Sequence, residues 1–326
     1  MAFRNSGNYE EQNPSDFSSV EIQGVLQEIF PGIALQEIYF LYHGTYNVYL
    51  IRDHFIFRFP DRHIPQHEAV LLLKREQALL QFLAPRLTIR IPDPIYFSLD
   101  PSHPFMGYEI IPGISLSRCF TQASPTQQNE MAQQIGRFLS ELHSPQTLEE
   151  FQKWQKSNQN PSPIVAFSPQ SYKMKWRKFF TRIQTEFYPL IRLEEQKWTS
   201  HIFHSFLENG PNFHFSPTLV HGDFDTPNIL VDPDTFTVTG VIDFEEARIY
   251  DSAADFLFYD AGDHFLREII ANYNLSRDPH FEARMKFLYC RTYLCYLDYG
   301  VQHQIPGMIE EGMLMLHKNM KRFPLS

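Results

Sequence analysis

Cysteine is scarce in this chain of 326 residues, which contains only Cys119, Cys290 and Cys295. An odd number of cysteines without a CxxC pair argues against a disulfide framework and against a cysteine-rich zinc site. Such cysteine usage is typical of a reducing compartment. We therefore expect a cytoplasmic location.

Long apolar runs are also missing. No stretch is as long and apolar as a membrane-spanning helix, and residues 1–17 lack the apolar segment of a secretory signal. The sequence thus predicts no membrane association. We expect residues 1–17 to form a flexible tail.

Positive charge is in deficit, because 28 Lys and Arg residues face 38 Asp and Glu residues, for a formal net charge of -10. Nucleic-acid phosphates are bound by clustered basic groups, so this balance disfavours a nucleic-acid partner. A small cationic molecule fits the charge better. Nothing in the sequence indicates an obligate protein partner.

Apolar and aromatic residues, in contrast, are abundant. Hydrophobic residues make up 43% of the chain and aromatic residues 15%, including 30 Phe and 16 Tyr. This composition is sufficient for a dense core. The length favours two lobes that share a cleft over one domain of average size.

The first third of the chain is predicted to form a small lobe, residues 18–112. Ser18 or Ser19 can cap a first helix, and a longer helix starts at Pro65 and ends before Pro85. Strands rich in β-branched and aromatic residues are expected near 36–43, 46–52, 54–59, 95–99 and 105–111. The tight connection at 52–54 is typical of an antiparallel sheet.

The remainder, residues 113–326, is predicted to form a larger, mostly helical lobe. Helices are expected at 125–142, 171–190 and 193–207, with three more after Asp263. One island of short strands, residues 218–242, interrupts them. The fold class is therefore α+β, with a small antiparallel sheet lobe and a larger helical lobe.

The island carries the densest group of chemically capable polar residues. Phosphoryl transfer needs one carboxylate to orient the attacking hydroxyl, and an amide oxygen with a second carboxylate to hold Mg²⁺. Asp223, Asn228 and Asp243 provide this set. If strand 229–231 pairs with strand 241–243, Asn228 and Asp243 lie at the same edge of the sheet, where one ion can bridge them.

These residues stand in His221-Gly222-Asp223, four intervening residues and Asn228, followed by Ile242-Asp243-Phe244. The arrangement resembles the signature of the aminoglycoside phosphotransferase family, and the resemblance covers most of the chain. It implies a two-lobed, protein-kinase-like fold and an enzyme that transfers the terminal phosphate of ATP or GTP to a hydroxyl group. It further implies that Asp223 is catalytic, that Asn228 and Asp243 bind Mg²⁺, and that His221 orients the loop.

The small lobe is expected to hold the nucleotide phosphates. Strand alternation places Ile56 and Arg58 on one face of the strand. Arg58 stands where kinases usually carry a lysine for the α- and β-phosphates, and a guanidinium can bind these oxygens in a bidentate manner. Glu76 is its expected ion-pair partner, with Glu68 as the second candidate.

The purine base is expected near residues 106–113, which resemble the family's hinge between the lobes. The resemblance implies that the carbonyl of Glu109 and the amide of Ile111 face the base. It also implies that Val48 and Ile56 cover the base. The phosphate-covering loop, residues 43–47, has a single glycine and no GxGxxG pattern, and is the poorest match.

Several acidic residues surround this core motif. Asp251 and Asp255 resemble a family segment whose second acid braces the catalytic loop. Asp225 stands where protein kinases carry a lysine, and we interpret it as a turn residue rather than a ligand of a cationic acceptor. In the family's acceptor region, the candidates for binding ammonium groups are Asp260, Asp263 and Glu268, for which a solvated acidic face is the alternative.

The strand around Arg58 and the hinge look closest to enzymes that modify the 2''-hydroxyl of aminoglycosides. This favours an aminoglycoside acceptor and a role in antibiotic resistance. Kinases of choline, homoserine, methylthioribose, fructosamine or macrolides remain alternatives, as does a nucleotide-binding pseudoenzyme. A protein kinase is disfavoured because Glu245 follows Asp243-Phe244 where a glycine is expected, and because no Ala-Pro-Glu segment is present.

Overall fold

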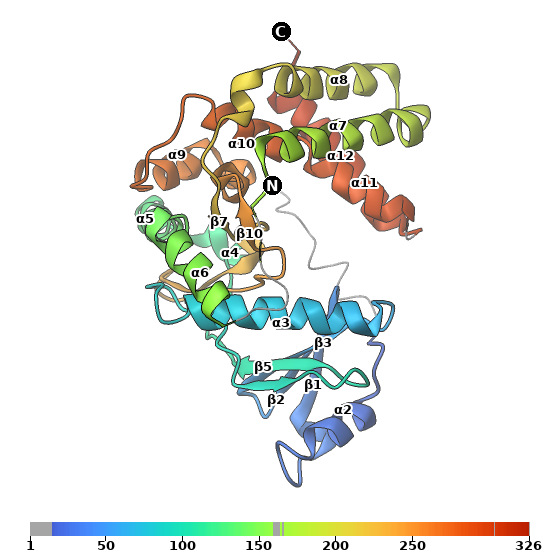
Figure 1. Cartoon of the computed structure of the whole chain (residues 1–326), viewed down its shortest axis with the longest axis vertical. Helices are drawn as coiled ribbons and strands as arrows, with labels where there is room; N and C mark the ends of the chain where they lie inside the picture. The colour runs from blue at the N-terminus through green and yellow to red at the C-terminus, as the bar shows by residue number, and fades with distance from the viewer. Residues whose placement is uncertain (1–14, 159–163, 165, 303, 326) are drawn as a thin grey trace.

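The computed structural model describes residues 15–158, 164, 166–302 and 304–325, which form a small sheet lobe and a larger helical lobe (Figure 1). Most of the expected tail, residues 1–14, lies outside the described residues. Phe17, at the end of that segment, is buried, and its ring lies 5.6 Å from the ring of Phe59. Residue 17 therefore packs on the small lobe.

The small lobe contains an antiparallel sheet with the strand order β1-β2-β3-β5-β4. Its strands are β1 (Ile38–His43), β2 (Tyr46–Ile51), β3 (Phe55–Pro60), β4 (Tyr96–Ser98) and β5 (Phe105–Glu109). The connection between β2 and β3 is tight, as predicted. Arg52 and Asp53 adopt positive φ angles of 53° and 52° there, as a short turn between twisted strands requires.

The two faces of this sheet serve different cores. Tyr49, Phe57 and Phe59 pack on the side of α2 (Ser19–Leu26), which begins with a capping box between Ser18 and Glu21. Val48 and Met106 instead belong to the main core, which includes α3 (Gln66–Leu83) and continues into the large lobe. The second face is therefore the one turned towards the large lobe, and Figure 1 shows α3 between the sheet and that lobe.

The large lobe is mostly helical. Its helices are α4 (Leu116–Cys119), α5 (Pro125–Leu142), α6 (Pro145–Ser157), α7 (Pro169–Glu186), α8 (Leu193–Leu207), α9 (Asp263–Ala271), α10 (Phe281–Cys290), α11 (Thr292–Gln302) and α12 (Pro306–Arg322). The predictions for 125–142 and 193–207 are confirmed. Helix α6 was not predicted.

Two helix predictions need correction. Helix α7 starts before residue 171, because Ser168 caps it and Pro169 occupies its first turn, and it ends at Glu186 rather than 190, where a 3₁₀ turn follows. In the described part of the chain, four helices begin from Asp263 onward where three were expected. The helical stretch 281–302 is interrupted at Arg291, which separates α10 from α11.

Short strands also occur among the described residues of the large lobe. They are β6 (Ile114–Ser115), β7 (Thr218–Val220), β8 (Ile229–Val231), β9 (Val238–Val241) and β10 (Arg248–Tyr250). β8 pairs with β9 and β6, whereas β7 pairs with β10. Ile229 lies opposite Val241, as predicted. The expected strand 241–243 is displaced, because β9 starts at Val238 and ends at Val241, and Asp243 turns away with a φ of 70°.

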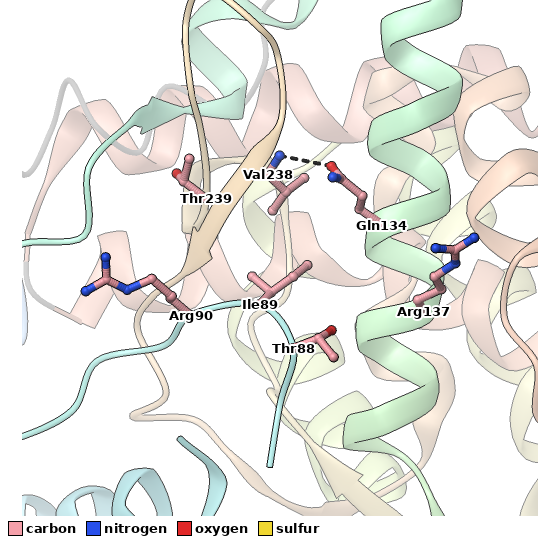
Figure 2. A pocket seen from close by; sticks show the side chains of 7 residues that line it. All are labelled: Thr88, Ile89, Arg90, Gln134, Arg137, Val238 and Thr239. Carbon is pink, nitrogen blue, oxygen red and sulfur yellow. Dashed lines mark hydrogen bonds between the residues drawn. The ribbon is translucent and has the colours of Figure 1, made fainter. Parts of the chain in front are cut away.

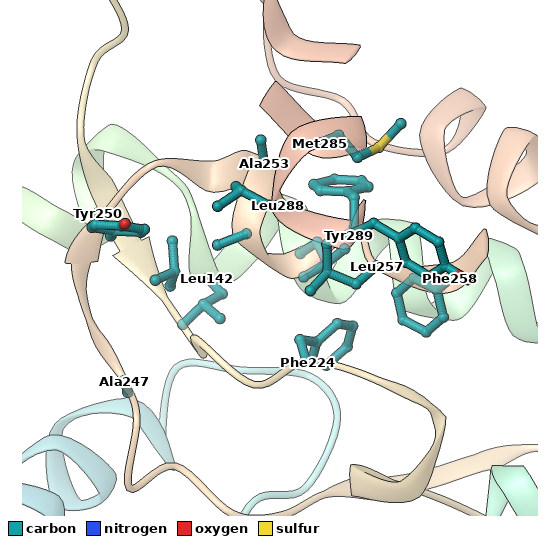
Figure 3. Close-up of a cluster of buried hydrophobic side chains, with 14 of the residues drawn as sticks. Leu142, Phe224, Ala247, Tyr250, Ala253, Leu257, Phe258, Met285, Leu288 and Tyr289 are labelled. Atoms are coloured by element: carbon teal, nitrogen blue, oxygen red, sulfur yellow. The ribbon is translucent and has the colours of Figure 1, made fainter. Parts of the chain in front are cut away.

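The core beneath β7 and β10 is dense and aromatic. Figure 3 shows Phe224, Leu257 and Phe258 among its buried side chains. Phe224 stacks on Phe138 of α5 at 5.5 Å and lies 5.6 Å from Phe258. Since Phe224 directly follows Asp223, this packing fixes the backbone that carries the predicted catalytic residue.

No helix within the described residues combines the length and the apolar character needed to cross a membrane.

Candidate active site

Asp223 and Asn228 lie together in the loop between β7 and β8. The Nδ2 group of Asn228 donates hydrogen bonds to the backbone oxygen of Asp223 at 2.9 Å and to its carboxylate at 3.2 Å. The carboxylate of Asp223 is exposed to solvent. Because the amide nitrogen of Asn228 is committed to Asp223, its amide oxygen is the atom left for a metal ion.

The loop is held by a buried acid. Asp255 accepts hydrogen bonds from the backbone N–H groups of His221 at 2.7 Å and of Gly222 at 2.8 Å, and its carboxylate lies 3.0 Å from Nε2 of His143. Burial alone would raise the pKa of Asp255, but these hydrogen bonds and the nearby imidazoles lower it. Asp255 is thus ionised, and its carboxylate holds the loop in place.

Two further features fix the shape of the loop. Gly222 has a φ of +89°, and a Cβ at this position would lie 2.3 Å from the backbone oxygen of Glu246. Only glycine fits there. Nε2 of His221 lies 2.9 Å from the backbone oxygen of Ile242, which ties the loop to the segment carrying Asp243. This position suits the loop-orienting role expected for His221.

Arg58 joins the two lobes. Its side chain is 5% exposed and forms an ion pair with Glu76. The same guanidinium lies 3.1 Å from Asp243 and 3.5 Å from Glu245 in the large lobe. It also lies 4.0 Å from the centre of the Tyr46 ring. Glu68 takes no part, because its carboxylate lies beside His67 at the exposed start of α3.

Around Arg58, negative charge is in excess. Burial raises the pKa of Asp243, the guanidinium of Arg58 opposes this shift, and the charge of Asp223 adds to it. Burial also raises the pKa of Glu245 well above its usual value, and the charge of Asp243 raises it further. Mutually repelling carboxylates that keep access to solvent suit a divalent cation with oxygen ligands. The side chain of Asp243 is 31% exposed, so the group is open to solvent.

Glu245 was not recognised as a site residue from the sequence. Its carboxylate accepts a hydrogen bond from Oγ1 of Thr45 at 3.1 Å, and Thr45 belongs to the loop expected to cover the phosphates. The signal was present, since a second acid stands two residues after Asp243. In the sequence analysis, Glu245 was used only as an argument against a protein kinase.

The residues predicted to hold the base share one region of the small lobe. Val48 is opposite Arg58 in the β2–β3 ladder, and Ile56 is opposite Tyr108 in the β3–β5 ladder, which places all of them on the face turned to the large lobe. At the hinge, Glu109 is exposed and Ile111 is buried. Side-chain atoms of Ile111 lie within 2.5 Å of where a Cβ on Gly240 would sit, so the hinge packs directly on β9.

Two of the three predicted acceptor residues are already paired. Asp260 accepts a hydrogen bond from the hydroxyl of Tyr289 and lies 2.6 Å from Nζ of Lys318. Asp263 forms an ion pair with Arg322, which is also on α12. Glu268 is half-buried on α9. A cationic acceptor at Asp260 or Asp263 must therefore compete with a side chain of α12.

Asp225 caps the 3₁₀ turn that precedes β8. Its carboxylate accepts the N–H of Thr226 at 2.7 Å, and its backbone oxygen accepts the N–H of Asn228 at 3.0 Å. These contacts agree with the interpretation of Asp225 as a turn residue. They also place Asn228 at the start of the strand.

A shallow hollow lies away from these residues, between α5, β9 and the segment 88–90 (Figure 2). Its lining consists of Thr88, Ile89, Arg90, Gln134, Arg137, Val238 and Thr239. Two hydrogen bonds brace β9 here: the N–H of Val238 donates to Gln134 at 2.9 Å, and that of Val241 donates to the backbone oxygen of Arg90 at 2.9 Å. The residues that line the hollow support β9, and none of them is a predicted site residue.

Known proteins resemble this chain in sequence pattern and in fold. The model of a family described as "Phosphotransferase enzyme family" matches residues 38–283. A solved complex of APH(2")-IIia with GDP and kanamycin has a TM-score of 0.79 at 22% identity, covering 93% of this chain and 99% of that chain. The gentamicin complex of APH(2")-IIa has a TM-score of 0.65 at 20% identity, covering 93% of this chain and 97% of that chain.

Macrolide enzymes share the fold as well. The macrolide 2'-phosphotransferase MphH from Brachybacterium faecium has a TM-score of 0.67 at 18% identity, covering 94% of this chain and 99% of that chain. No curated protein matches the chain significantly. The expected α+β, protein-kinase-like fold is confirmed by these likenesses.

Proposed function

The chain belongs to the phosphotransferase enzyme family, and from this premise we propose that it is a magnesium-dependent small-molecule kinase with Asp223 as its catalytic residue. The observation that carries the proposal is the convergence of Arg58 from the small lobe with Asp243 from the large lobe, 3.1 Å apart. The lobes meet near residue 112, and their cleft receives the terminal phosphate of ATP or GTP. A cytoplasmic location, expected from the cysteine usage, suits such an enzyme.

The donor nucleotide lies under the small lobe in this proposal. Arg58, oriented by Glu76, binds the phosphate oxygens, and Val48 and Ile56 cover the base. The backbone carbonyl of Glu109 and the backbone amide of Ile111 form hydrogen bonds with the edge of the base. Similar folds support a nucleotide donor, since they include complexes described as containing GDP and ADP.

Asn228 and Asp243 hold Mg²⁺ in this proposal, and Glu245 supplies a further carboxylate next to them. The donor set fits the ion, because hard divalent cations prefer carboxylate and amide oxygens. When bound, Mg²⁺ neutralises the charge of the donor phosphates. The repulsion between Asp243 and Glu245 is relieved at the same time.

Asp223 acts on the acceptor. Its carboxylate accepts a hydrogen bond from the attacking hydroxyl and aligns the oxygen with the terminal phosphorus, while Asn228 holds the carboxylate from the other side. Asp255, through the N–H groups of His221 and Gly222, keeps this loop from shifting. Most of the rate enhancement comes from position and charge, because phosphoryl transfer passes through a loose transition state.

An aminoglycoside is the first acceptor that we propose, with Asp260, Asp263 and Glu268 as candidates to bind its ammonium groups and drug resistance as the corresponding role. Its support is the likeness to folds that hold kanamycin and gentamicin. A macrolide is the second candidate. The pairing of Asp260 with Lys318 and of Asp263 with Arg322 favours an acceptor that needs no free carboxylate.

A turnover screen tests the proposal. The full chain is assayed with ATP and with GTP, each with Mg²⁺, against kanamycin, gentamicin, a macrolide and choline, and phosphorylated product is identified by mass spectrometry. We expect product from one acceptor class with wild type and none with Asp223→Asn. Product formation by Asp223→Asn at the wild-type rate would contradict the assignment. If choline alone were phosphorylated, both proposed drug acceptors would be wrong, but the assignment as a small-molecule kinase would still hold.

A further inference from the structure

Unpartnered polar atoms gather around β10, where α3, α7 and the break between α10 and α11 approach it. Among the described residues, three buried arginine Nε atoms in this region lack a hydrogen-bond partner, those of Arg75, Arg248 and Arg291. Nε1 of Trp176 and the hydroxyl of Tyr250 lie in the same region, beside the hydroxyl of Tyr172. Buried donors without partners are rare and costly, so their concentration indicates a missing acceptor.

Cations surround two neighbouring aromatic rings here. Nζ of Lys175 lies 5.3 Å from the ring centre of Tyr250 and 5.2 Å from that of Trp176. The guanidinium of Arg248 lies 4.8 Å from the Tyr250 ring, and that of Arg291 lies 5.0 Å from the Trp176 ring. Lys175 therefore stands between the two arginines.

Arg75 of α3 completes this group. Its Nη2 donates to the backbone oxygen of Ala247 at 2.9 Å, one residue before Arg248. We call Arg75, Lys175, Arg248 and Arg291 the basic cluster. Its four members come from four parts of the chain that are far apart in sequence.

The positive charge of the basic cluster is poorly compensated. Glu246 accepts a hydrogen bond from Nη1 of Arg248 at 2.5 Å, whereas no carboxylate of the described residues lies within ion-pair distance of Lys175 or Arg291. Nη1 of Arg291 donates a hydrogen bond to the sulfur of Cys295 at 2.8 Å. Burial, together with the charges of Arg248 and Arg291, lowers the pKa of Lys175 to about 8. Four cations thus face one carboxylate in a chain whose net charge is -10.

The basic cluster is accessible from solvent. Trp176 and Tyr250 are buried at 3% and 1% exposure, and Figure 3 shows Tyr250 on β10 at the edge of the buried core. Lys175 is exposed, and the side chain of Arg248 is 19% exposed. The aromatic rings position the cations through cation–π contacts, but such contacts leave the Nε–H groups without acceptors.

We propose that the basic cluster binds a phosphate-type oxyanion, with Lys175, Arg248 and Arg291 as its charged partners. A doubly charged oxyanion accepts several charge-assisted hydrogen bonds at once and offsets the repulsion among the cations. The same chemistry is offered by free phosphate and by the phosphate group of a larger ligand. This site does not depend on which acceptor the kinase uses.

The proposed site is linked to the catalytic loop. Arg248 pairs with Val220 in the β7–β10 ladder, and Val220 directly precedes His221. The backbone oxygen of Glu246 packs against Gly222. A bound oxyanion would therefore stiffen the strand on which the loop containing Asp223 rests.

Thermal unfolding of the full chain tests the proposal. Melting is measured in sodium phosphate and in sodium chloride at matched ionic strength and pH 7, with saturating ADP and Mg²⁺ so that phosphate does not act through the nucleotide site. Lys175→Met and Arg248→Gln remove members of the basic cluster. Lys178→Met is the matched control, because Lys178 is exposed on the next turn of α7.

We expect phosphate to raise the Tm of wild type and of Lys178→Met beyond the effect of chloride. Phosphate affinity should be at least about tenfold weaker in Lys175→Met and Arg248→Gln, as expected for the loss of one charge-assisted hydrogen bond. Without phosphate, Lys175→Met should melt no lower than wild type, because a repulsive charge is removed. If phosphate then failed to raise the Tm of Lys175→Met, misfolding of the variant would not be the cause.

Two outcomes would overturn the proposal. One is a wild-type Tm that phosphate raises no more than chloride does. The other is a phosphate response of equal size in Lys175→Met and Arg248→Gln. A parallel titration with glycerol phosphate separates the two sources, since tighter binding of the monoester indicates the phosphate group of a larger ligand, and equal or weaker binding indicates the free anion.

Discussion

Arg58 in the small lobe and Asp243 in the large lobe are 3.1 Å apart, although 185 residues separate them in the sequence. The contact places the proposed phosphate-binding cation of one lobe against the proposed metal-binding acid of the other. Nucleotide and Mg²⁺ would enter between them.

Replacing Asp223 with Asn should lower kcat by about 100-fold to 10,000-fold, the usual contribution of a positioned acid–base group. Nucleotide affinity should stay within about twofold of wild type, because Asp223 contacts the acceptor rather than the donor. Steady-state kinetics and calorimetric titration with ADP measure the two effects. Asp234→Asn, at an exposed turn, serves as the control, and an equal loss in both variants would contradict the role of Asp223.

Replacing Arg58 with Met should destabilise the protein by about 3–5 kcal/mol, because buried Glu76 then loses its compensating charge. Nucleotide binding should be lost as well. Arg58→Lys keeps the charge without the planar fork, so it should recover part of the stability and part of the affinity. Urea unfolding and ADP titration give both quantities. If Arg58→Met bound ADP like wild type, Arg58 would not be the phosphate ligand.

Replacing Gly222 with Ala should abolish most activity while lowering stability by about 1–3 kcal/mol, since a Cβ is forced into a left-handed backbone against Glu246. Gly24→Ala is the matched control. Gly24 lies inside α2 with open space around it, so alanine should stabilise the helix by up to about 1 kcal/mol. A Gly222→Ala enzyme with wild-type kcat would show that the loop tolerates a shift.

Removing Lys318 tests the acceptor region. Lys318→Met leaves Asp260 without its cation, so KM for a cationic acceptor should fall several-fold, whereas KM for a macrolide should not change. Lys321→Met, on the same helix and exposed, is the control. A higher KM for aminoglycosides in Lys318→Met would show that Asp260 does not bind their ammonium groups.

Stability should depend on pH through Lys175. Its pKa is lowered to about 8 in the folded protein, while the unfolded chain keeps the ordinary, higher value and binds the proton more strongly. Stability must therefore rise as pH increases above about 8. The groups facing Lys175 are Arg248, Arg291, Glu246 and Cys295. In phosphate-free buffer, the Tm advantage of Lys175→Met over wild type should shrink between pH 7 and pH 10, and an advantage that grows would contradict the shift.

The active-site loop was predictable because its parts are close in sequence. Asp223, Asn228 and the pairing of Ile229 with Val241 follow from motif spacing and from the alternation of short strands. Glu76 was found because kinases pair the cation of this strand with an acid on the helix that follows. Helix α6 was missed, although Ser144 and Pro145 mark its start. Its polar residues gave no clear apolar stripe.

Pairs between distant segments could not be predicted. Lys318 reaches Asp260, and Arg291 reaches Trp176, only because α10, α11 and α12 pack in a particular order. The sequence gives no distance between such residues. Glu245 is a different case, since its importance depends on Thr45 and Arg58 meeting it across the cleft.

The contacts of Glu245 with Thr45 and Arg58 connect the two lobes. The carboxylate lies between the covering loop and the guanidinium, so each lobe depends on an acid of the other for part of its polar contacts. Phosphate oxygens that bind Arg58 would compete with Glu245 for the guanidinium. Binding of the donor would then exchange one anion for another at the junction of the lobes, without leaving the buried cation uncompensated.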